Sequence, residues 1–335
     1  PIMQFVGNLG YVGVSILGGY LAIKGSIEVG DIQSFIQYVR SFTQPIQQIA
    51  QVANMLQSTA AASERVFEFL EEEEEVQMVE HPVSIEGLKG NVSFEHVKFG
   101  YNPDHIIIKD FSVDVKQGQK IAIVGPTGAG KTTMIKLLMR FYDVNEGAIL
   151  VDGHDIKDFN RGELREMFGM VLQDTWLFNG TIEDNIKYGK LNATHEEVVE
   201  AAKAAYVDQF VQTLPNGYNM VLNEEASNVS QGQKQLLTIA RAILADPKIL
   251  ILDEATSSVD TRTEIRIQKA MDNLMEGRTS FIIAHRLSTI RDADLILVMK
   301  DGDIVEQGKH QELLNQNGFY AELYNSQFES ATSCA

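Results

Sequence analysis

The stretch GPTGAGKTT, residues 125–133, decides the fold of the region that contains it. It has the spacing G-x-x-x-x-G-K-[ST], follows an apolar run at residues 121–124 and precedes a helical pattern. Glycines would let backbone N–H groups and the following helix N-terminus surround a phosphate closely. Lys131 would place its charge on the β and γ phosphates, and the Thr132 hydroxyl would bind Mg²⁺. The stretch therefore predicts binding of a nucleoside triphosphate.

Three further elements follow in order, and each supplies a group that handles phosphate. They are VSQGQ at residues 229–233, ILILDEAT at residues 249–256, and His285 in IIAHR. Asp253 ends an apolar strand, where a carboxylate is costly unless it serves a metal, and Glu254 beside it can orient or deprotonate a water. A neutral imidazole at His285 can hold the γ phosphate. These residues predict hydrolysis of that phosphate.

The VSQGQ stretch opens another helix. Ser230 is the expected N-cap, because the apolar residues that follow it keep helical spacing as far as Leu244. Gly232 in the first turn weakens the helix but lets a phosphate approach its free N–H groups. We expect a second anion site that has no lysine of its own, with an ordinary capped helix as the alternative.

From residue 91 onward, short apolar runs alternate with helical stretches. Alternating patterns at residues 92–99 and 111–115 predict strands, as do the runs at 121–124, 170–172, 249–252, 280–283 and 295–299. We expect an α/β P-loop domain with a mainly parallel core sheet, an antiparallel β subdomain and an inserted helical subdomain over residues 181–244.

Residues 1–23 carry no charge and are long enough to cross about 30 Å of hydrocarbon as a helix. Gly7, Gly10 and Gly13 recur every third residue, which predicts close packing against neighbouring helices. A buried core helix of a soluble domain is the alternative. A secretory signal is disfavoured because no basic region precedes the apolar stretch.

A second helical pattern runs from about residue 31 to 70, and Pro45 is expected to kink or loosen it. Its polar residues recur in steps of three and four, so they share one face: Gln33, Gln37, Arg40, Gln44, Gln47, Gln48, Gln51, Asn54 and Ser58. Such a face should line a water-filled path or meet partner helices. A cytosolic bundle helix is the alternative.

These patterns predict the domain boundaries. We expect all-α membrane spans at about 1–23 and 31–53, a cytosolic helix extension to 70, an acidic linker over 71–90, a nucleotide-binding domain over 91–328 and a tail over 329–335. The run Glu71–Glu75 should stay hydrated because like charges repel. The chain starts without Met, and we expect it to be the C-terminal portion of a longer membrane protein.

The formal charge of −18 excludes nucleic acid as an expected partner, since binding a phosphate backbone needs clustered cations. Cys334 is the only cysteine, so the sequence contains neither a disulfide framework nor a thiolate metal site.

The motifs together resemble the ATP-binding cassette family, and specifically exporter half-transporters in which membrane helices precede the cassette. The resemblance implies ATP contacts at Tyr101, which would stack on adenine, and at Gly125, Pro126, Thr127, Gly128, Ala129, Gly130, Lys131, Thr132 and Thr133. It implies that Gln173 takes part in catalysis with Glu254 and His285, and in Mg²⁺ binding with Thr132 and with Asp253, which would act through a water molecule. Asp260 would lie in the loop after the catalytic carboxylate, and Glu224 in the exporter cross-contact loop.

The resemblance also implies a head-to-tail pair of cassettes. Each ATP would lie between the phosphate loop of one cassette and the signature of the other, here Ser230, Gln231, Gly232 and Gln233. The implied activity is ATP-driven export of a drug, a lipid or another amphipathic cargo across a bacterial inner membrane, with the cassette in the cytoplasm. A soluble cassette ATPase and a non-hydrolysing regulatory half-transporter are the rival classes.

One departure from the family pattern concerns the partner. The signature is usually LSGGQ, whereas Gln231 replaces a glycine here, and Asn223 and Ala226 replace two glycines of the cross-contact loop. The catalytic groups Glu254 and His285 are intact. This combination resembles the half of a heterodimeric bacterial exporter that contributes the complete catalytic carboxylate, with a homodimer as the alternative.

Overall fold

A computed structural model describes residues 2–102, 104–172, 175–223, 228–253, 260–284 and 287–326. The chain divides into two compact units, Pro1–Glu75 and Val76–Ala335, and each is described by itself.

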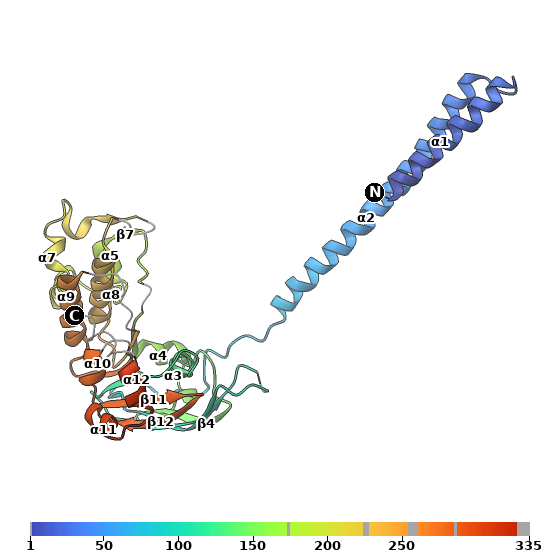
Figure 1. Cartoon of the computed structure of the whole chain (residues 1–335). Coiled ribbons are helices and arrows are strands. Elements are labelled where there is room, and N and C mark those ends of the chain that lie inside the picture. Colours follow the sequence, from blue (N-terminus) through green and yellow to red (C-terminus); the bar gives the residue numbers. More distant parts are fainter. Residues whose placement is uncertain are drawn as a thin grey trace. The chain divides into compact units, whose positions relative to one another are not determined.

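The first unit is a pair of helices, α1 (Ile2–Ile23) and α2 (Val29–Leu70), with α1 lying along the first part of α2 (Figure 1). Glycines of α1 face α2: a Cβ on Gly18 would lie 2.9 Å from Ile32, and one on Gly10 would lie 3.7 Å from Val39. Of the predicted three-residue repeat, Gly10 and Gly7 face α2, because a Cβ on Gly7 would lie 3.9 Å from Thr43. A Cβ on Gly13 would meet nothing within 4 Å, so two of the three positions contact α2.

The second helix runs through Pro45 without interruption, so the expected loosening does not break it. Among the described helices, only the segment Phe5–Ile23 is long and apolar enough to cross a membrane by composition. The glutamine stripe lowers the apolarity of α2. A second span at about residues 31–53 therefore stays a prediction from the sequence pattern.

The second unit is built on a ten-stranded sheet with the order β5-β4-β1-β2-β12-β11-β3-β10-β9-β6. Its strands are β1 (Val92–Phe99), β2 (Ile108–Val115), β3 (Lys120–Val124), β4 (Glu146–Val151), β5 (His154–Asp155), β6 (Phe168–Val171), β9 (Ile249–Asp253), β10 (Thr279–Ile283), β11 (Leu295–Lys300) and β12 (Asp303–Gly308). The run β11-β3-β10-β9-β6 is parallel, whereas β1 pairs antiparallel with β2 and β4. The predicted mixed architecture is confirmed.

The sequence patterns missed β4, β5 and β12. The first residues of β4 and most of β12 are exposed or half-buried, so neither strand has a continuous apolar run. Two-residue β5 is too short to give a periodic signal.

Helices cover the sheet and form the inserted subdomain. The helical region predicted for residues 181–244 contains α5 (Ile182–Lys187), α6 (His195–Ala204), α7 (Asp208–Val211), the 3-10 turn η2 (Gly217–Asn219) and α8 (Gln231–Ala245), with a short pair of strands β7 (Gly180–Thr181) and β8 (Val221–Leu222). The remaining helices are α3 (Lys131–Leu138), η1 (Ile156–Asp158), α4 (Arg161–Glu166), α9 (Thr261–Met275), α10 (Leu287–Arg291), α11 (His310–Asn315) and α12 (Phe319–Tyr324).

The domain has two hydrophobic cores, one on each face of the parallel strands, and β3 contributes side chains to both. Ile121 and Ile123 pack with α3 and the antiparallel strands, whereas Ala122 and Val124 pack with the helical subdomain. This alternation follows from the period of two in a strand. Because both faces of β3 are buried, the loop that leaves its C-terminal end starts from a rigid support.

Candidate nucleotide site

The loop of residues 125–130 joins β3 to α3 at the carboxyl end of the parallel strands. Its first residue must be glycine: Gly125 has a φ of +154°, and a Cβ there would lie 2.3 Å from the carbonyl oxygen of Met299 on β11. The loop can therefore pass close to the neighbouring strand only because this side chain is missing.

The loop lines a cavity of about 700 Å³. Residues 127–133 form one wall, and Asp253 and Ile283, from the ends of β9 and β10, lie on another. Three residues singled out from the sequence, Lys131, Thr132 and Asp253, thus meet in one space although Asp253 is far away in the chain.

Lys131 is the first residue of α3, directly after the loop. Its Nζ donates hydrogen bonds to the carbonyl oxygens of Gly125 at 2.7 Å and Pro126 at 2.9 Å. Burial lowers the pKa of the Lys131 ammonium, and the negative charge of Asp253 opposes this change. Partial desolvation strengthens the attraction of this cation for a polyanion, whereas the nearby carboxylate suits a metal cation.

The donor set fits a magnesium ion held together with phosphates. The Thr132 hydroxyl and the Asp253 carboxylate are oxygen ligands that line the same cavity, and Mg²⁺ prefers one or two protein ligands plus phosphate and water oxygens. Among the described residues no group of three or more His, Cys, Asp or Glu side chains could hold a metal by itself. A metal here would therefore depend on the nucleotide.

The strand register pairs two residues that lie close in the chain to the predicted catalytic groups. β9 and β10 are parallel, and Asp253 pairs with Ile283. Glu254 directly follows Asp253, and His285 comes two residues after Ile283. Glu254 and His285 lie outside the described residues, as do Gln173, Glu224 and Ala226, so their catalytic or contact roles stay predictions.

Tyr101 lies beside Thr133, the last residue of the loop motif. Its hydroxyl is 3.5 Å from Thr133 Oγ1, and its ring packs edge-on against Phe99 and Tyr142, with centroid distances of 5.0 Å to each. The Tyr101 residue is 43% exposed, so its surface is open to a flat ligand. Its stacking on adenine stays a prediction.

The signature residues form a separate capped helix start. Ser230 Oγ accepts from the N–H of Gln233 at 3.3 Å, and the N–H of Ser230 donates to Gln233 Oε1 at 2.8 Å. Ser230 is therefore the N-cap that the sequence predicted. Gln231, the unusual residue, donates from Nε2 to Thr175 Oγ1 at 3.3 Å. The structure does not place these residues in the cavity of Lys131.

Asp260 caps another helix. It is the N-cap of α9 and accepts from the N–H of Thr263 at 3.0 Å. The hydrogen bond from Thr263 lowers the pKa of the Asp260 carboxyl. This capping contact is what the structure assigns to Asp260, and its role in the loop after the catalytic carboxylate stays a prediction.

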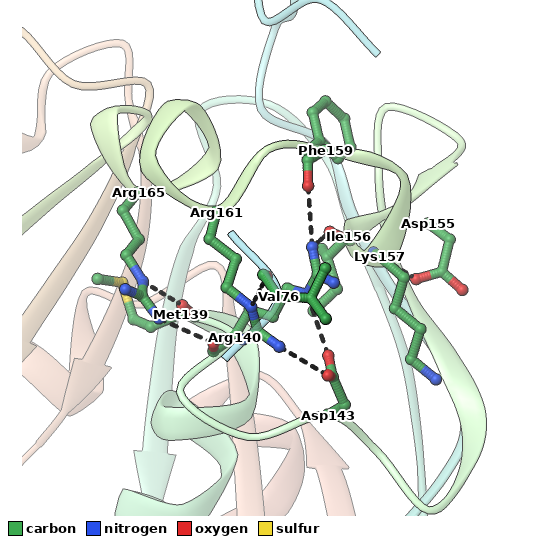
Figure 2. A network of polar contacts seen from close by, with 10 residues as sticks. All are labelled: Val76, Met139, Arg140, Asp143, Asp155, Ile156, Lys157, Phe159, Arg161 and Arg165. Atoms are coloured by element: carbon green, nitrogen blue, oxygen red, sulfur yellow. Dashed lines mark hydrogen bonds and ion pairs between the residues drawn. The ribbon is translucent and has the colours of Figure 1, made fainter. Parts of the chain in front are cut away.

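Three arginines anchor the end of α3 that lies opposite the phosphate loop (Figure 2). Arg161 donates from Nη1 to the carbonyl oxygen of Arg140 at 2.6 Å, and Arg165 donates from Nε to that of Met139 at 3.3 Å. Arg140 in turn donates to the carbonyl oxygens of Ile156 at 3.1 Å and Phe159 at 2.9 Å. Cations at a helix C-terminus are stabilising, so this network holds α3, and through it the phosphate loop.

Asp143 is the acid of this arginine network. It accepts from Arg140 at 3.0 Å and from Arg161 at 2.7 Å, and both arginine side chains are 6% exposed. Burial by itself would raise the pKa of the Asp143 carboxyl, but the hydrogen bonds and charges of the two arginines outweigh burial and lower it.

The same network holds the linker. Arg161 donates from Nε to the carbonyl oxygen of Val76 at 2.9 Å, and Asn160 Oδ1 accepts from the N–H of Val79 at 3.0 Å (Figure 2 shows Val76). No sequence pattern predicted these contacts. Arginines spaced along a helix with one nearby aspartate are a common surface pattern, so nothing in the sequence marked them as buried.

The sequence analysis also missed the second side of the cavity. His105, Ile106, Ile107, Lys109 and Asp301 line it. These residues come from the segment before and within β2 and from the turn between β11 and β12, which have no motif. Only the strand order places them beside the loop.

Residues 108–257 match the family model described as ABC transporter. A protein from Mycobacterium bovis named fatty acid ABC transporter ATP-binding/permease protein is 55% identical over 323 residues, which cover 96% of this chain and 51% of that protein. The ATP-dependent lipid A-core flippase of Desulfotalea psychrophila is 43% identical over 327 residues, 98% of this chain and 57% of the flippase.

A solved structure of similar architecture is described as a bacterial Atm1-family ABC exporter with ATP bound. It matches with a TM-score of 0.73 and 39% identity, over 97% of this chain and 57% of that one. The chain spans about half the length of the curated relatives it matches. The phosphate loop and Asp253 lie within the matched residues 108–257, and this region of the chain belongs to the ABC transporter family.

Proposed function

We propose that this chain is the ATP-hydrolysing part of a membrane exporter that couples ATP binding and hydrolysis at a pair of cassettes to the export of an amphipathic cargo. The observation that carries the proposal is the convergence of Lys131, Thr132 and Asp253 in one cavity at the ends of parallel strands. The names of the relatives, a fatty acid transporter and a lipid flippase, support a lipid-like cargo.

In the proposed mechanism, the chain's own residues bind and orient the reactants. Lys131 would neutralise the β and γ phosphates, and Thr132, Asp253 and Gln173 would hold Mg²⁺. The ion supplies charge stabilisation for the phosphates when bound. Glu254 accepts a proton from the attacking water, and His285 holds the γ phosphate. The bond from the γ phosphorus to the bridging oxygen breaks, giving ADP and inorganic phosphate.

The proposed assembly is a head-to-tail dimer of cassettes. Ser230 and Gly232 would contact the ATP held by the phosphate loop of the second cassette, which agrees with their separation from Lys131 within this chain. Closure on ATP and opening after hydrolysis would move the membrane helices between inward and outward access. The replacement of a signature glycine by Gln231 favours a heterodimer.

The proposed location is a bacterial inner membrane, with the α1 and α2 helices crossing it and the cassette in the cytoplasm. The apolar segment Phe5–Ile23 supports one crossing. The second crossing follows from the pairing of α2 with α1 along that segment.

Nucleotide binding tests the site directly. In the complete gene product, Lys131→Ala should weaken ATP binding at least about tenfold, because it removes a charge-assisted hydrogen bond at the phosphates. Equilibrium binding of a fluorescent ATP analogue measures this loss. Lys116→Ala, which removes an exposed lysine between β2 and β3, is the matched control and should bind as the wild type does. Tight binding by the Lys131 variant would contradict the assignment of the loop.

A further inference from the structure

A polar cavity of about 530 Å³ lies between α1 and α2. Asn8 and Tyr11 line it from α1, and Arg40, Gln44 and Gln47 line it from α2. Its residues are outside the nucleotide domain, and no step of the proposed hydrolysis uses them.

Arg40 is the notable residue of this cavity. It is the only charged residue between Asp31 and Glu64, and α1 carries no charge. Its guanidinium carbon lies 5.7 Å from the centroid of the Tyr11 ring, which is near the middle of the 22-residue helix α1. If the two helices cross a membrane as proposed, Arg40 lies at the depth of the hydrocarbon, where an arginine is costly and faces an interior or a water-filled cavity.

The described part of the chain compensates this charge only in part. The face of Tyr11 attracts the guanidinium, but none of the described Asp or Glu side chains forms an ion pair with Arg40. The nearby Thr43 hydroxyl donates to the carbonyl oxygen of Val39 in its own helix. A guanidinium has five N–H donors in a planar fork, and this fork fits a carboxylate or phosphate through two parallel hydrogen bonds.

The neighbouring side chains extend the donor set. Gln44 and Gln47 follow Arg40 by four and seven residues, so they lie on the same face of α2, and Asn8 lies on the opposite wall. Each amide can donate two hydrogen bonds. Val39 and Gly7 line the same cavity and give it an apolar side. The site therefore combines one fixed cation and several amides with apolar surface.

We infer that Arg40, with Gln44 and Gln47, forms a subsite for the anionic head group of an amphiphile, a carboxylate or a phosphate whose hydrocarbon chain lies along the apolar helix surfaces. The inference rests on the proposed export function and predicts that the exported molecule carries a negative charge. The competing structural role is an ion pair between Arg40 and a carboxylate elsewhere in the complete gene product.

Equilibrium binding without nucleotide tests the subsite. The complete gene product, in nanodiscs of phosphatidylcholine, is titrated with hexadecanoate, hexadecyl phosphate and hexadecanol, which share a chain and differ in head group. Arg40→Gln should lower the affinity for at least one anionic probe by about tenfold or more, because charge-assisted hydrogen bonds are lost. The affinity for hexadecanol should stay the same. A loss for hexadecanoate alone assigns a carboxylate, and a loss for hexadecyl phosphate alone assigns a phosphate.

The matched control is Lys24→Gln. Lys24 is a cation in the turn between the two helices, and its Nζ also lies over a tyrosine ring, 4.5 Å from the centroid of Tyr20. It follows α1 and does not line the cavity. This variant should bind all three probes as the wild type does. An equal loss in the Lys24 and Arg40 variants would mean that net charge alone attracts the probes, and would overturn the subsite.

If Arg40→Gln leaves the ratio of the affinities for the anionic probes and for hexadecanol unchanged, the inference is overturned. A purely structural ion pair of Arg40 predicts this unchanged ratio together with a lower melting temperature of the variant.

If Arg40→Gln does not fold, Arg40→Lys and Gln44→Leu replace it in the test. Both should lower anionic binding several-fold relative to hexadecanol, because they remove the planar fork or one amide. ATP hydrolysis by the wild type is measured in the same nanodiscs. Its absence would contradict the proposed function, whereas an unchanged binding ratio with hydrolysis intact contradicts only the subsite.

Discussion

At the scale of single residues, Asp143 balances two buried guanidinium groups behind the phosphate loop. Asp143→Asn should lower the free energy of unfolding of the nucleotide domain by about 1–2 kcal/mol at pH 7, a value that allows for the 41% exposure of the Asp143 side chain. Urea unfolding of the wild type and the variant measures the difference. Glu146→Gln removes the acid of the exposed Lys98 pair, 2.6 Å apart, and should cost less.

The stability difference at Asp143 should depend on pH. The folded pKa of its carboxyl lies below the ordinary value, so its stabilising contribution is present above the ordinary pKa, about 3.9, and is lost as the pH falls through the folded pKa. The wild type and Asp143→Asn should therefore converge in stability below about pH 4. A difference that stays constant from pH 7 to the acid limit would contradict the ionic role of this residue.

Gly302 packs against the side of the nucleotide cavity that no sequence motif marks. Its φ is +86°, and a Cβ there would lie 1.9 Å from the carbonyl oxygen of Ile107, which lines the cavity. Gly302→Ala should therefore lower stability and also weaken ATP binding, because the turn must move away from Ile107. Gly153→Ala is the control: its φ is +84°, but a Cβ would meet nothing within 4 Å. It should cost only about 1 kcal/mol and leave ATP binding unchanged. Equal effects of the two substitutions on binding would contradict the account.

At the scale of secondary-structure elements, the start of α8 combines a structural and a functional role. Ser230→Ala should remove the N-cap and lower stability by about 1 kcal/mol, and Thr194→Ala at the matching cap of α6 should do the same. Only the Ser230 variant should also reduce ATP hydrolysis by the assembled dimer, because only this cap is proposed to face a nucleotide. Thermal unfolding and phosphate release from both variants separate the roles. Hydrolysis that falls equally in both would assign Ser230 to helix stability alone.

The elements show what the sequence could predict. Strands β3, β9 and β10 are buried on both faces, so their apolar runs stand out, and Asp253 is conspicuous as the acid that ends such a run. β12 alternates between half-buried and exposed residues and lacks that signal. The arginine network could not be predicted, since it depends on three segments that meet only in the folded domain.

At the scale of the whole molecule, the acidic run Glu71–Glu75 separates the helix pair from the nucleotide domain. The linker that follows is tied to the nucleotide domain by Asn160 and Arg161. The boundary between the two compact units falls after Glu75, and the domain limits given by the sequence patterns stay predictions. The proposed heterodimer rests on the replacement of a signature glycine by Gln231, and the sequence of one chain cannot identify the second cassette.

The measurement that tests the central claim most directly is Mg²⁺-dependent release of phosphate from ATP by the complete gene product, alone and together with any half-transporter encoded next to it. We expect hydrolysis that requires Mg²⁺ and that falls at least about 100-fold in Glu254→Gln, while ATP binding is kept and the closed dimer accumulates. Activity only with the neighbour would establish the heterodimer, and activity alone a homodimer. Absence of Mg²⁺-dependent hydrolysis in both preparations, or unchanged turnover in Glu254→Gln, would contradict the account.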